Sequence, residues 1–433
     1  MPTKFSQRQA IIIFGGIALV IVFFVIIFLN LRKPANTGPT IKLTVWGTED
    51  AGAFAPIASS YPYGTVTYKQ IDPSDYQAEL LSALAAGTGP DVFEIGNREL
   101  PQWLSVITPL PASYAAQFGS LQLSQDFPDV VAQDFTAETP SGTLGIYGLP
   151  LSVDTMVMIY NKDLFNTAGI ALPPTTWDQF DSDIPKLRAL DAQGDIVAAA
   201  AAIGGTQASI PEAPDLVSLL MLQNGTQMTD SNDTSAQFGA ANGNGLSAFN
   251  FYLQFANPTS PNYTWNDNMG NDIDSFVAGK TAIIFGYQSD LAMIQAKAPF
   301  MNYGIAAMPQ PTGATVAVNY PRYNGFVVAK ASPQAVYAWN FILYLTTTDS
   351  VEKMYVGATG APPALRTEIA ADADDPNLSV FAAQVLTAKS WYEADDTQVD
   401  SIFNQAITNV LSGADDSTKA LNQAQAAVTA LMQ

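Results

Sequence analysis

Apolar and polar residues alternate at intervals along this chain in the pattern of short β-strands. Residues 41–46, IKLTVW, alternate and end at Gly47, and the mainly apolar run 91–95, DVFEI, ends at Gly96. Between them, residues 76–85 carry apolar side chains at helical spacing. The pattern predicts a strand–helix–strand unit, whose right-handed crossover makes the two strands parallel.

A longer stretch, residues 149–177, reads LPLSVDTMVMIYNKDLFNTAGIALPPTTW. Its apolar run from Val153 to Tyr160 predicts a buried strand, and Asn161 is placed to cap a short helix. Two prolines follow, and Thr176 is a suitable cap for a second helix that begins at Trp177. A strand, a short helix and a rigid step indicate a crossing between two compact bodies.

The rest of the chain continues the same alternation of strands and helices. Apolar runs predict further strands at residues 145–151, 196–202, 281–285, 303–308 and 326–329. Helical spacing predicts helices at residues 215–222, 245–255, 332–345, 350–357, 376–388, 397–411 and 417–431. No repeat of 20–50 residues is apparent, so the pattern indicates an α/β chain without a solenoid.

The first 40 residues have a different character. Residues 10–29 contain no charge, and about 20 helical residues span a bilayer. A cleaved signal peptide has a shorter apolar region, of about 7–15 residues, and a small-residue cleavage site, whereas residues 29–33 read LNLRK. We therefore expect a tail at 1–9, a retained transmembrane anchor at 10–31 and a polar linker at 32–40; the alternative is cleavage.

Charge restricts the partners of the remaining chain. Residues 1–40 hold four of the 18 Lys and Arg residues and none of the 39 Asp and Glu residues, so the remainder has a formal charge of −25. Such a charge repels nucleic acid and anionic membrane surfaces. We expect no nucleic-acid partner, and we expect the large domain to face the extracytoplasmic side of the cell membrane on a single-pass anchor.

The chain contains no Cys and no His. Disulfides, thiolate nucleophiles, a Ser-His-Asp triad and the usual zinc ligands are therefore excluded. Carboxylate-only catalysis and Ca²⁺ binding stay open on composition alone. We expect no cofactor and no metal.

Several segments, taken together and in order, resemble the family 1 extracellular solute-binding proteins of ABC importers. They are IKLTVWG, ALAAGTGPDVFEIGN, LPLSVDTMVMIYNKDLFNTAGIALPPTTWDQF, SFVAGKTAIIFGY, YGIAAMPQP, GFVVAKASPQAVYAWNFILYLT and GATGAPPALR. The second and third are the specific ones. The resemblance covers nearly all of residues 41–433.

The resemblance implies a two-lobed α/β fold of the periplasmic-binding-protein type II, in which each lobe is a mixed, mostly parallel sheet flanked by helices. We expect a solute-binding domain at 41–433. Its first lobe would comprise about 41–149 and 287–322, and its second about 150–286 and 323–433. A hinge and a ligand cleft would lie between the lobes, and the transmembrane anchor departs from the family's usual cleaved signal or lipidated cysteine.

Sugar sites combine flat aromatic rings with side chains that hydrogen-bond hydroxyl groups. Positions matching the family's ligand contacts, or leaving predicted strands, give eleven candidates: Trp46, Glu49, Asn97, Arg98, Asp154, Tyr287, Gln288, Tyr320, Arg322, Tyr323 and Asn324. The alternatives are core packing for Trp46, a solvated loop for Asn97 and Arg98, a structural ion pair for Asp154, and hinge packing for residues 320–324. Trp265 and Trp391 are weaker candidates, because an isolated Trp usually packs in a core.

The resemblance implies a protein that captures a carbohydrate, such as an oligosaccharide, by hinge closure and delivers it to ABC permease subunits, and the predicted anchor would tether it to the membrane. We expect a monomer and no enzyme activity. The two arginines leave room for an acidic sugar. Two other functions stay open: a surface sensor or adhesin with the same fold, and a glycoside hydrolase that uses carboxylates such as Glu49 and Asp154.

Overall fold

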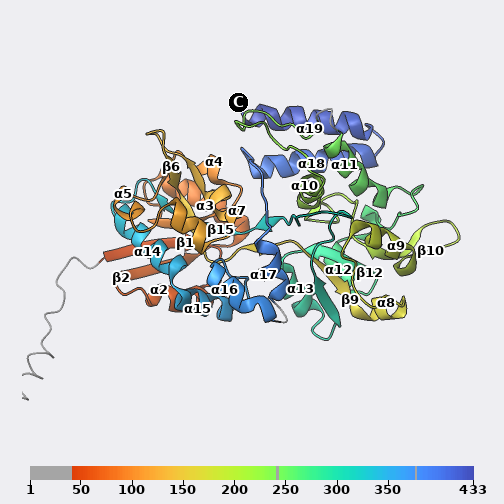
Figure 1. Ribbon diagram of the computed structural model, residues 1–433, viewed down its shortest axis with the longest axis horizontal. Coiled ribbons are helices and arrows are strands. Elements are labelled where there is room, and N and C mark those ends of the chain that lie inside the picture. The colour runs from red at the N-terminus through yellow and green to blue at the C-terminus, as the bar shows by residue number, and fades with distance from the viewer. Residues whose placement is uncertain (1–40, 240–242, 376–377) are drawn as a thin grey trace, which may run out of the picture.

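Two β-sheets, each covered by helices, form two lobes in the computed structural model, which describes residues 41–239, 243–375 and 378–433 (Figure 1). The lobe 1 sheet has the order β2 (Gly64–Gln70), β1 (Ile41–Gly47), β3 (Val92–Gly96), β15 (Asn324–Ala329) and β4 (Ile107–Thr108), with β7 (Gly148–Pro150) also paired to β15. The lobe 2 sheet has the order β10 (Ala189–Leu190), β11 (Ile196–Ala201), β12 (Thr281–Gly286), β9 (Val157–Asn161) and β13 (Tyr303–Ala306).

Helices pack around both sheets. Those of lobe 1 are α2 (Ala51–Ser59), α3 (Pro73–Ala85), α4 (Leu100–Trp103), α5 (Ala112–Ala115), α6 (Ser120–Asp126), α7 (Asp129–Phe135), α14 (Ala335–Thr347), α15 (Asp349–Thr359) and α16 (Arg366–Ala371). Those of lobe 2 are α8 (Lys162–Thr167), α9 (Trp177–Leu187), α10 (Ala213–Gln223), α11 (Asn244–Leu253), α12 (Asp272–Val277), α13 (Gln288–Lys297), α18 (Asp396–Leu411) and α19 (Ser417–Leu431). Between the lobes lies α17 (Ser379–Val385), and a small hairpin of β5 (Thr136–Glu138) and β6 (Leu144–Ile146) extends lobe 1.

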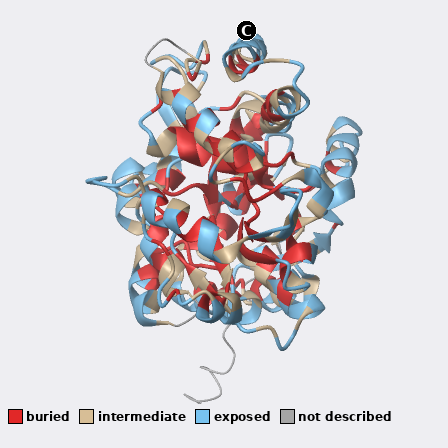
Figure 2. Cartoon of the chain, turned by 90° about the vertical axis from the view of Figure 1, so that its right-hand side faces the viewer, coloured by how far each residue is buried: buried red, intermediate tan, exposed pale blue. Residues whose placement is uncertain are grey.

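Three passages of the chain connect the lobes. In the first two, β8 (Asp154–Thr155) pairs with β14 (Pro321–Arg322) as a separate two-stranded sheet. The third passage runs beside the second, where Asn319 forms a bridge with Ala388. Each lobe has its own hydrophobic core, and Figure 2 shows the buried residues in the interior with exposed residues around them. The predicted two-lobed α/β fold is confirmed.

The predicted division of the chain between the lobes was wrong for much of its second half. Residues 287–322 were assigned to lobe 1, but β13 pairs with β9 in lobe 2. Residues 323–433 were assigned to lobe 2, but β15 pairs with β3 in lobe 1, and residues 326–369 contribute to the lobe 1 core. The end of the chain, α18 and α19, does pack in the lobe 2 core, as predicted. After β12 the chain stays in lobe 2 until it crosses at β14, because β13 completes that sheet first.

The sheets are mixed, but the prediction that they are mostly parallel was also wrong. The predicted unit of β1, α3 and β3 does give parallel pairing, and β1 also pairs in parallel with β2. The strand β15, however, returns from lobe 2 and runs antiparallel to β3, β4 and β7. In lobe 2, β9 runs antiparallel to both of its neighbours. A strand that returns from the other lobe enters its sheet from the opposite end.

Local capping predictions were accurate. The Asn161 side chain accepts hydrogen bonds from the backbone N–H groups of Asp163 and Leu164 and so caps α8. Thr176 caps α9 through the N–H of Gln179. The single predicted strand from Val153 to Tyr160 is divided into β8 in the hinge and β9 in the sheet.

The predicted tail, anchor and linker, residues 1–9, 10–31 and 32–40, lie outside the described residues. Within the described part of the chain, no helix combines the length and apolar character needed to cross a bilayer. The anchor therefore stays a prediction.

Two helical glycines offer a test of the packing. A Cβ added to Gly245 would lie 1.8 Å from the carbonyl oxygen of Phe238, whereas one added to Gly357 would meet nothing within 4 Å. We expect Gly245→Ala to lower the free energy of unfolding by about 1–3 kcal/mol, because the backbone must shift. Gly357→Ala, the matched control, should raise it by about 0.5–1 kcal/mol through helix propensity. Urea denaturation measures both, and similar changes in the two variants would contradict the packing of α11.

Candidate functional site

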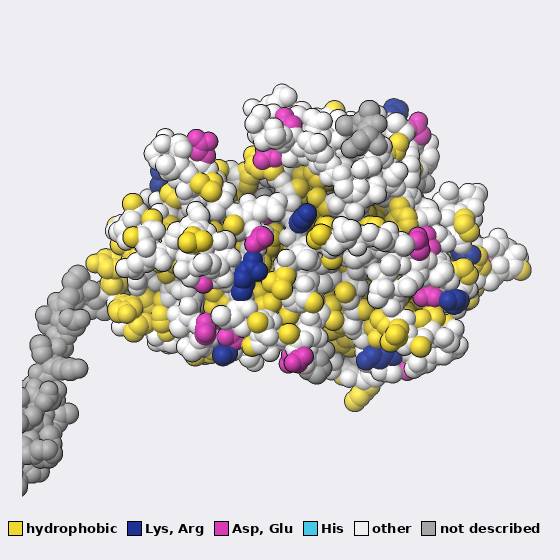
Figure 3. All heavy atoms as spheres, in the orientation of Figure 1, with side chains coloured by type: hydrophobic (Ala, Val, Ile, Leu, Met, Phe, Trp, Pro, Cys, Tyr) yellow, Lys and Arg dark blue, Asp and Glu magenta, His cyan; other side chains and the backbone are white. Residues whose placement is uncertain are grey.

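A pocket of about 470 Å³ lies between the lobes. Its walls come from lobe 1 at residues 97–104 and 133–137, from lobe 2 at residues 222–233, and from the third passage at residues 390–393. In Figure 3 the surface is hollowed between the two lobes near the top of the view, with acidic side chains on both sides. Pockets for small molecules have volumes of roughly 300–1,000 Å³ and often lie between domains. This pocket is therefore the candidate ligand site.

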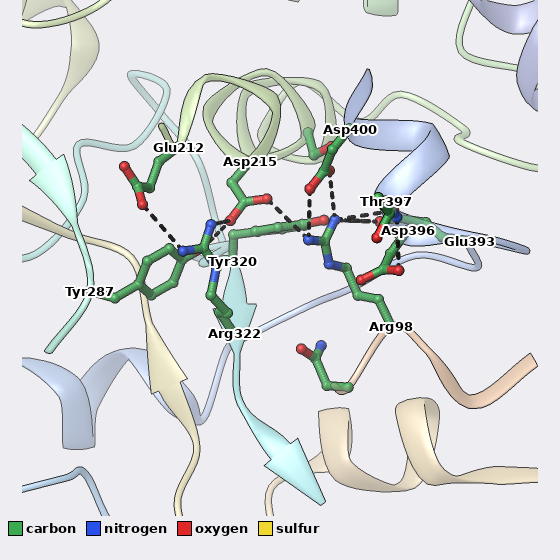
Figure 4. Close-up of polar contacts among 12 residues, drawn as sticks. Arg98, Glu212, Asp215, Tyr287, Tyr320, Arg322, Glu393, Asp396, Thr397 and Asp400 are labelled. Carbon is green, nitrogen blue, oxygen red and sulfur yellow. Dashed lines mark hydrogen bonds and ion pairs between the residues drawn. The ribbon is translucent and has the colours of Figure 1, made fainter. Parts of the chain in front are cut away.

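One guanidinium joins the two lobes beside this pocket (Figure 4). Arg98 follows β3 in lobe 1, and its side chain is only 9% exposed. Its Nη1 lies 3.1 Å from Oε2 of Glu393 and 3.1 Å from Oδ1 of Asp400, and its Nη2 lies 3.6 Å from Oδ1 of Asp215. Asp215 is on α10 and Asp400 on α18, both in lobe 2. These ion pairs therefore cross from one lobe to the other.

A second guanidinium extends the same network along the hinge. Nη2 of Arg322 lies 2.6 Å from Oδ2 of Asp215, and its Nη1 lies 3.2 Å from Oε1 of Glu212. The guanidinium also lies over the ring of Tyr287, 4.2 Å from the ring centroid, and the Tyr287 hydroxyl donates to Asp215. The Arg322 side chain is 42% exposed, so this part of the network remains open to solvent.

The carboxylates of the network do not share one electrostatic environment. Burial raises the pKa of Asp215, but Arg322 and Arg98 outweigh burial and leave that pKa below its ordinary value. Burial raises the pKa of Glu393 to about 8, and Arg98 offsets only part of that effect. Burial raises the pKa of Glu212 in the same way, and the charge of Arg322 offsets part of that effect. Carboxylates outnumber guanidiniums here, and burial favours the protonated forms of Glu212 and Glu393 over their charged forms.

The structure brings five of the predicted site residues together. Asn97 and Arg98 line the pocket, and Tyr287, Tyr320 and Arg322 belong to the adjoining network. The rings of Tyr287 and Tyr320 are fully buried, and the Tyr320 hydroxyl donates to Glu393. In this conformation neither ring presents a face to a ligand, and ligand contact by these residues stays a prediction.

Of four further predicted residues, Asp154 lies in the hinge strand β8, Gln288 begins α13 in lobe 2, and Trp46 and Tyr323 are packed in or against lobe 1. The carboxylate of Asp154 accepts the N–H groups of Thr155 and Gln288, each at 2.8 Å, and burial raises its pKa to about 7. Asp154 forms no ion pair among the described residues, so the structural ion pair considered as an alternative is replaced by these two hydrogen bonds. Tyr323 is buried and donates to Asp134. The half-buried Trp46 lies under Lys69, whose Nζ is 4.0 Å from the ring centroid.

The remaining two predicted residues lie elsewhere in lobe 1. Glu49 accepts a hydrogen bond of 2.8 Å from the hydroxyl of Tyr355 on α15, and burial raises its pKa. Asn324 is exposed at the start of β15. Neither lines the pocket between the lobes.

The sequence patterns missed most of the pocket wall from lobe 2 and the third passage. Trp391, a weaker candidate on sequence grounds, does line the pocket, although it is 6% exposed and packs on Phe238 and Phe403. Tyr392 and Glu393 follow it directly. The sequence signal for this part of the wall was a pair of adjacent aromatic residues followed by an acid, Trp391 to Glu393, between two predicted helices. Glu212 and Asp215, at the start of α10, by contrast gave no signal, because their partners are distant in the sequence.

Comparison with known proteins agrees with the observed fold. The family model described as bacterial extracellular solute-binding protein matches residues 48–352. A putative binding protein of Brucella abortus is 26% identical over 371 residues, 82% of each chain. The maltooligosaccharide ABC transporter solute-binding lipoprotein of Streptococcus pneumoniae is 26% identical over 289 residues, 64% of each chain.

Solved structures give the same answer for the fold. The cyclic alpha-maltosyl-1,6-maltose binding protein of Arthrobacter globiformis superposes with a TM-score of 0.75 at 20% identity, covering 91% of this chain and 99% of that one. The predicted type II fold and family are therefore confirmed. With its two lobes, three hinge passages and pocket between the lobes, the chain belongs to the bacterial extracellular solute-binding proteins.

Proposed function

We propose that this protein captures a carbohydrate in the pocket between its lobes and delivers it to an ABC importer without chemical change. The observation that carries the proposal is the pocket itself, which takes its walls from both lobes and from the third hinge passage. A ligand that contacts both lobes stabilises the closed arrangement by contacts that the open one lacks. The importer would then recognise the closed form.

The chemistry of the pocket wall supports a sugar as the ligand. Apolar and aromatic side chains, including Met228 and Tyr392, alternate there with hydrogen-bonding groups such as Gln133 and Thr229. Sugars present apolar C–H faces and hydroxyl rims, so they need both kinds of partner. The volume of the pocket suits an oligosaccharide of a few units.

We also propose that residues 10–31 anchor the protein in the membrane with the lobes on the extracytoplasmic side. Twenty uncharged residues are long enough to cross a bilayer. A short linker at 32–40 would keep the lobes near the membrane and raise their effective concentration beside the permease.

A saccharide panel tests the proposal. The full-length protein, kept in detergent, should melt at a higher temperature with at least one oligosaccharide, because a ligand at 100 times its Kd adds about 2.7 kcal/mol to the folded state. Dipeptides of similar size serve as controls. A shift with dipeptides and none with any saccharide would overturn the carbohydrate assignment, and recovery of shortened sugars would indicate a hydrolase.

A pair of variants locates the binding site. Tyr392 lines the pocket and is 36% exposed, whereas Tyr337 is 46% exposed on α14, away from the pocket. We expect Tyr392→Ala to weaken sugar binding about tenfold, because an aromatic face is lost. Tyr337→Ala should leave the Kd unchanged. Equal affinities for both variants in calorimetry would exclude this pocket.

A further inference from the structure

The pocket between the lobes carries an excess of negative charge. Its ionisable lining residues are Arg98, Asp134, Glu393 and Asp233. The guanidinium of Arg98 is already shared among three carboxylates. Asp134 accepts hydrogen bonds from Asn97 and from the hydroxyl groups of residues 323 and 390. Asp233 is different, because it has no cationic partner within the described residues.

Asp233 is held at the pocket by a rigid turn. The carboxylate of Asp230 accepts hydrogen bonds from the N–H groups of Asn232 and Thr234 and from the hydroxyls of residues 234 and 235. These four hydrogen bonds fix the loop. Asp233 itself has a φ of 53°, the left-handed conformation that non-glycine residues seldom adopt. Its side chain is exposed, and its Oδ1 accepts a hydrogen bond of 2.6 Å from Thr229. The carboxylate is therefore held at the pocket wall, where no cationic side chain of the described residues neutralises its charge.

An aromatic ring lies near this carboxylate. Tyr392 lines the same pocket, and burial together with the negative charge of Asp233 raises its pKa. A carboxylate and an aromatic ring in the wall of one pocket are a favourable environment for a cation, which can gain an ion pair from the first and a cation–π contact from the second.

A buried hydroxyl in the same wall has no partner. Oγ1 of Thr226 is inaccessible to solvent and forms no hydrogen bond within the described part of the chain, and the residue is 7% exposed. It lines the pocket together with Asp233 and Tyr392. Leaving a buried hydroxyl unpaired costs about 1–3 kcal/mol, so a rotation of the Thr226 side chain that turns this hydroxyl toward a ligand in the pocket would recover that free energy.

We propose that Thr226, Asp233 and Tyr392 form a subsite for a protonated amine, so that the preferred ligand is an amino-sugar oligosaccharide. This inference rests on the proposed carbohydrate function. An acidic sugar, which the two arginines seemed to allow on sequence grounds, is disfavoured, because Arg98 and Arg322 are both paired with carboxylates of the protein. The carboxylate of such a sugar would instead face Asp233, which has no cationic partner among the residues that the structure describes.

Three β-1,4-linked disaccharides that differ only in the group at C2 separate the effect of the amine's positive charge from the effect of the sugar ring. They carry an amine, an acetamide or a hydroxyl at C2, and calorimetry on the full-length protein in detergent would be run below the pKa of the amine. We expect the glucosamine disaccharide to bind about tenfold more tightly than N,N′-diacetylchitobiose and cellobiose, a difference of about 1.4 kcal/mol. The advantage should shrink as salt is added.

Asp233→Asn should abolish that advantage, and asparagine tolerates the left-handed conformation well enough to preserve the turn. Asp178→Asn, which removes an exposed carboxylate on α9 outside the pocket, should leave it intact. Equal binding of the three disaccharides to the wild type, or an amine preference that survives Asp233→Asn, would overturn the subsite while leaving carbohydrate binding in place. Failure of every saccharide to bind would overturn the subsite and the proposed function together.

Discussion

Replacing Asp215 by asparagine should lower the free energy of unfolding by about 3 kcal/mol at neutral pH. The carboxylate is 2% exposed and lies between two guanidiniums, those of Arg98 and Arg322. Asparagine keeps an acceptor for the Tyr287 hydroxyl but removes the charge. Removal of one partner from a buried ion pair costs about 3–5 kcal/mol, and the low end applies here because each guanidinium retains another carboxylate.

Chemical denaturation of Asp215→Asn measures this loss. The control is Asp75→Asn, on the exposed first turn of α3, which should change stability by no more than about 0.5 kcal/mol. The pKa of Asp215 lies below its ordinary value, so its contribution is present above that value and is lost as the pH falls through the folded pKa. A loss that persisted unchanged at acidic pH would show that packing, and not charge, is responsible.

Stability should fall as the pH is raised from about 5 to 8, and Glu352→Gln should reduce that fall. Glu352 is 1% exposed on α15, and burial raises its pKa to about 8. Between its ordinary pKa and this value, the folded protein holds a proton that the unfolded chain releases. Each such group lowers the free energy of unfolding by about 1.4 kcal/mol per pH unit, and the effect ends above the folded pKa.

The glutamine variant removes this titration while keeping the structural role of the side chain. Oε1 of Glu352 accepts the N–H groups of Ala364 and Leu365 at 2.6 and 2.8 Å, and a glutamine oxygen can accept both. The variant should resemble the wild type near pH 5 and exceed it by about 3–4 kcal/mol at pH 8. Urea denaturation across this range provides the measurement, with Glu138→Gln on the exposed β5 as control. A constant difference between Glu352→Gln and the wild type would mean that Glu352 is ionised throughout.

The sequence determined the local structure of this protein and its family. Strand and helix positions follow from apolar periodicity, and the caps at Asn161 and Thr176 act within three residues of themselves. The seven segments in family order identify the two-lobed fold, because they preserve both residue type and spacing. Local interactions of this kind can be read along the chain.

Only the tertiary structure decided which lobe each late strand joins and what the pocket contains. The strand β15 pairs with β3, more than 220 residues earlier, and Arg98 meets Asp400 at a separation of 302 residues. Periodicity shows that a strand has a buried face, but it does not identify the neighbouring strand that covers it. Nor does it show that Asp215 satisfies two arginines while Asp233 has no cationic partner among the described residues, because charge balance in a cleft depends on side chains that folding brings together.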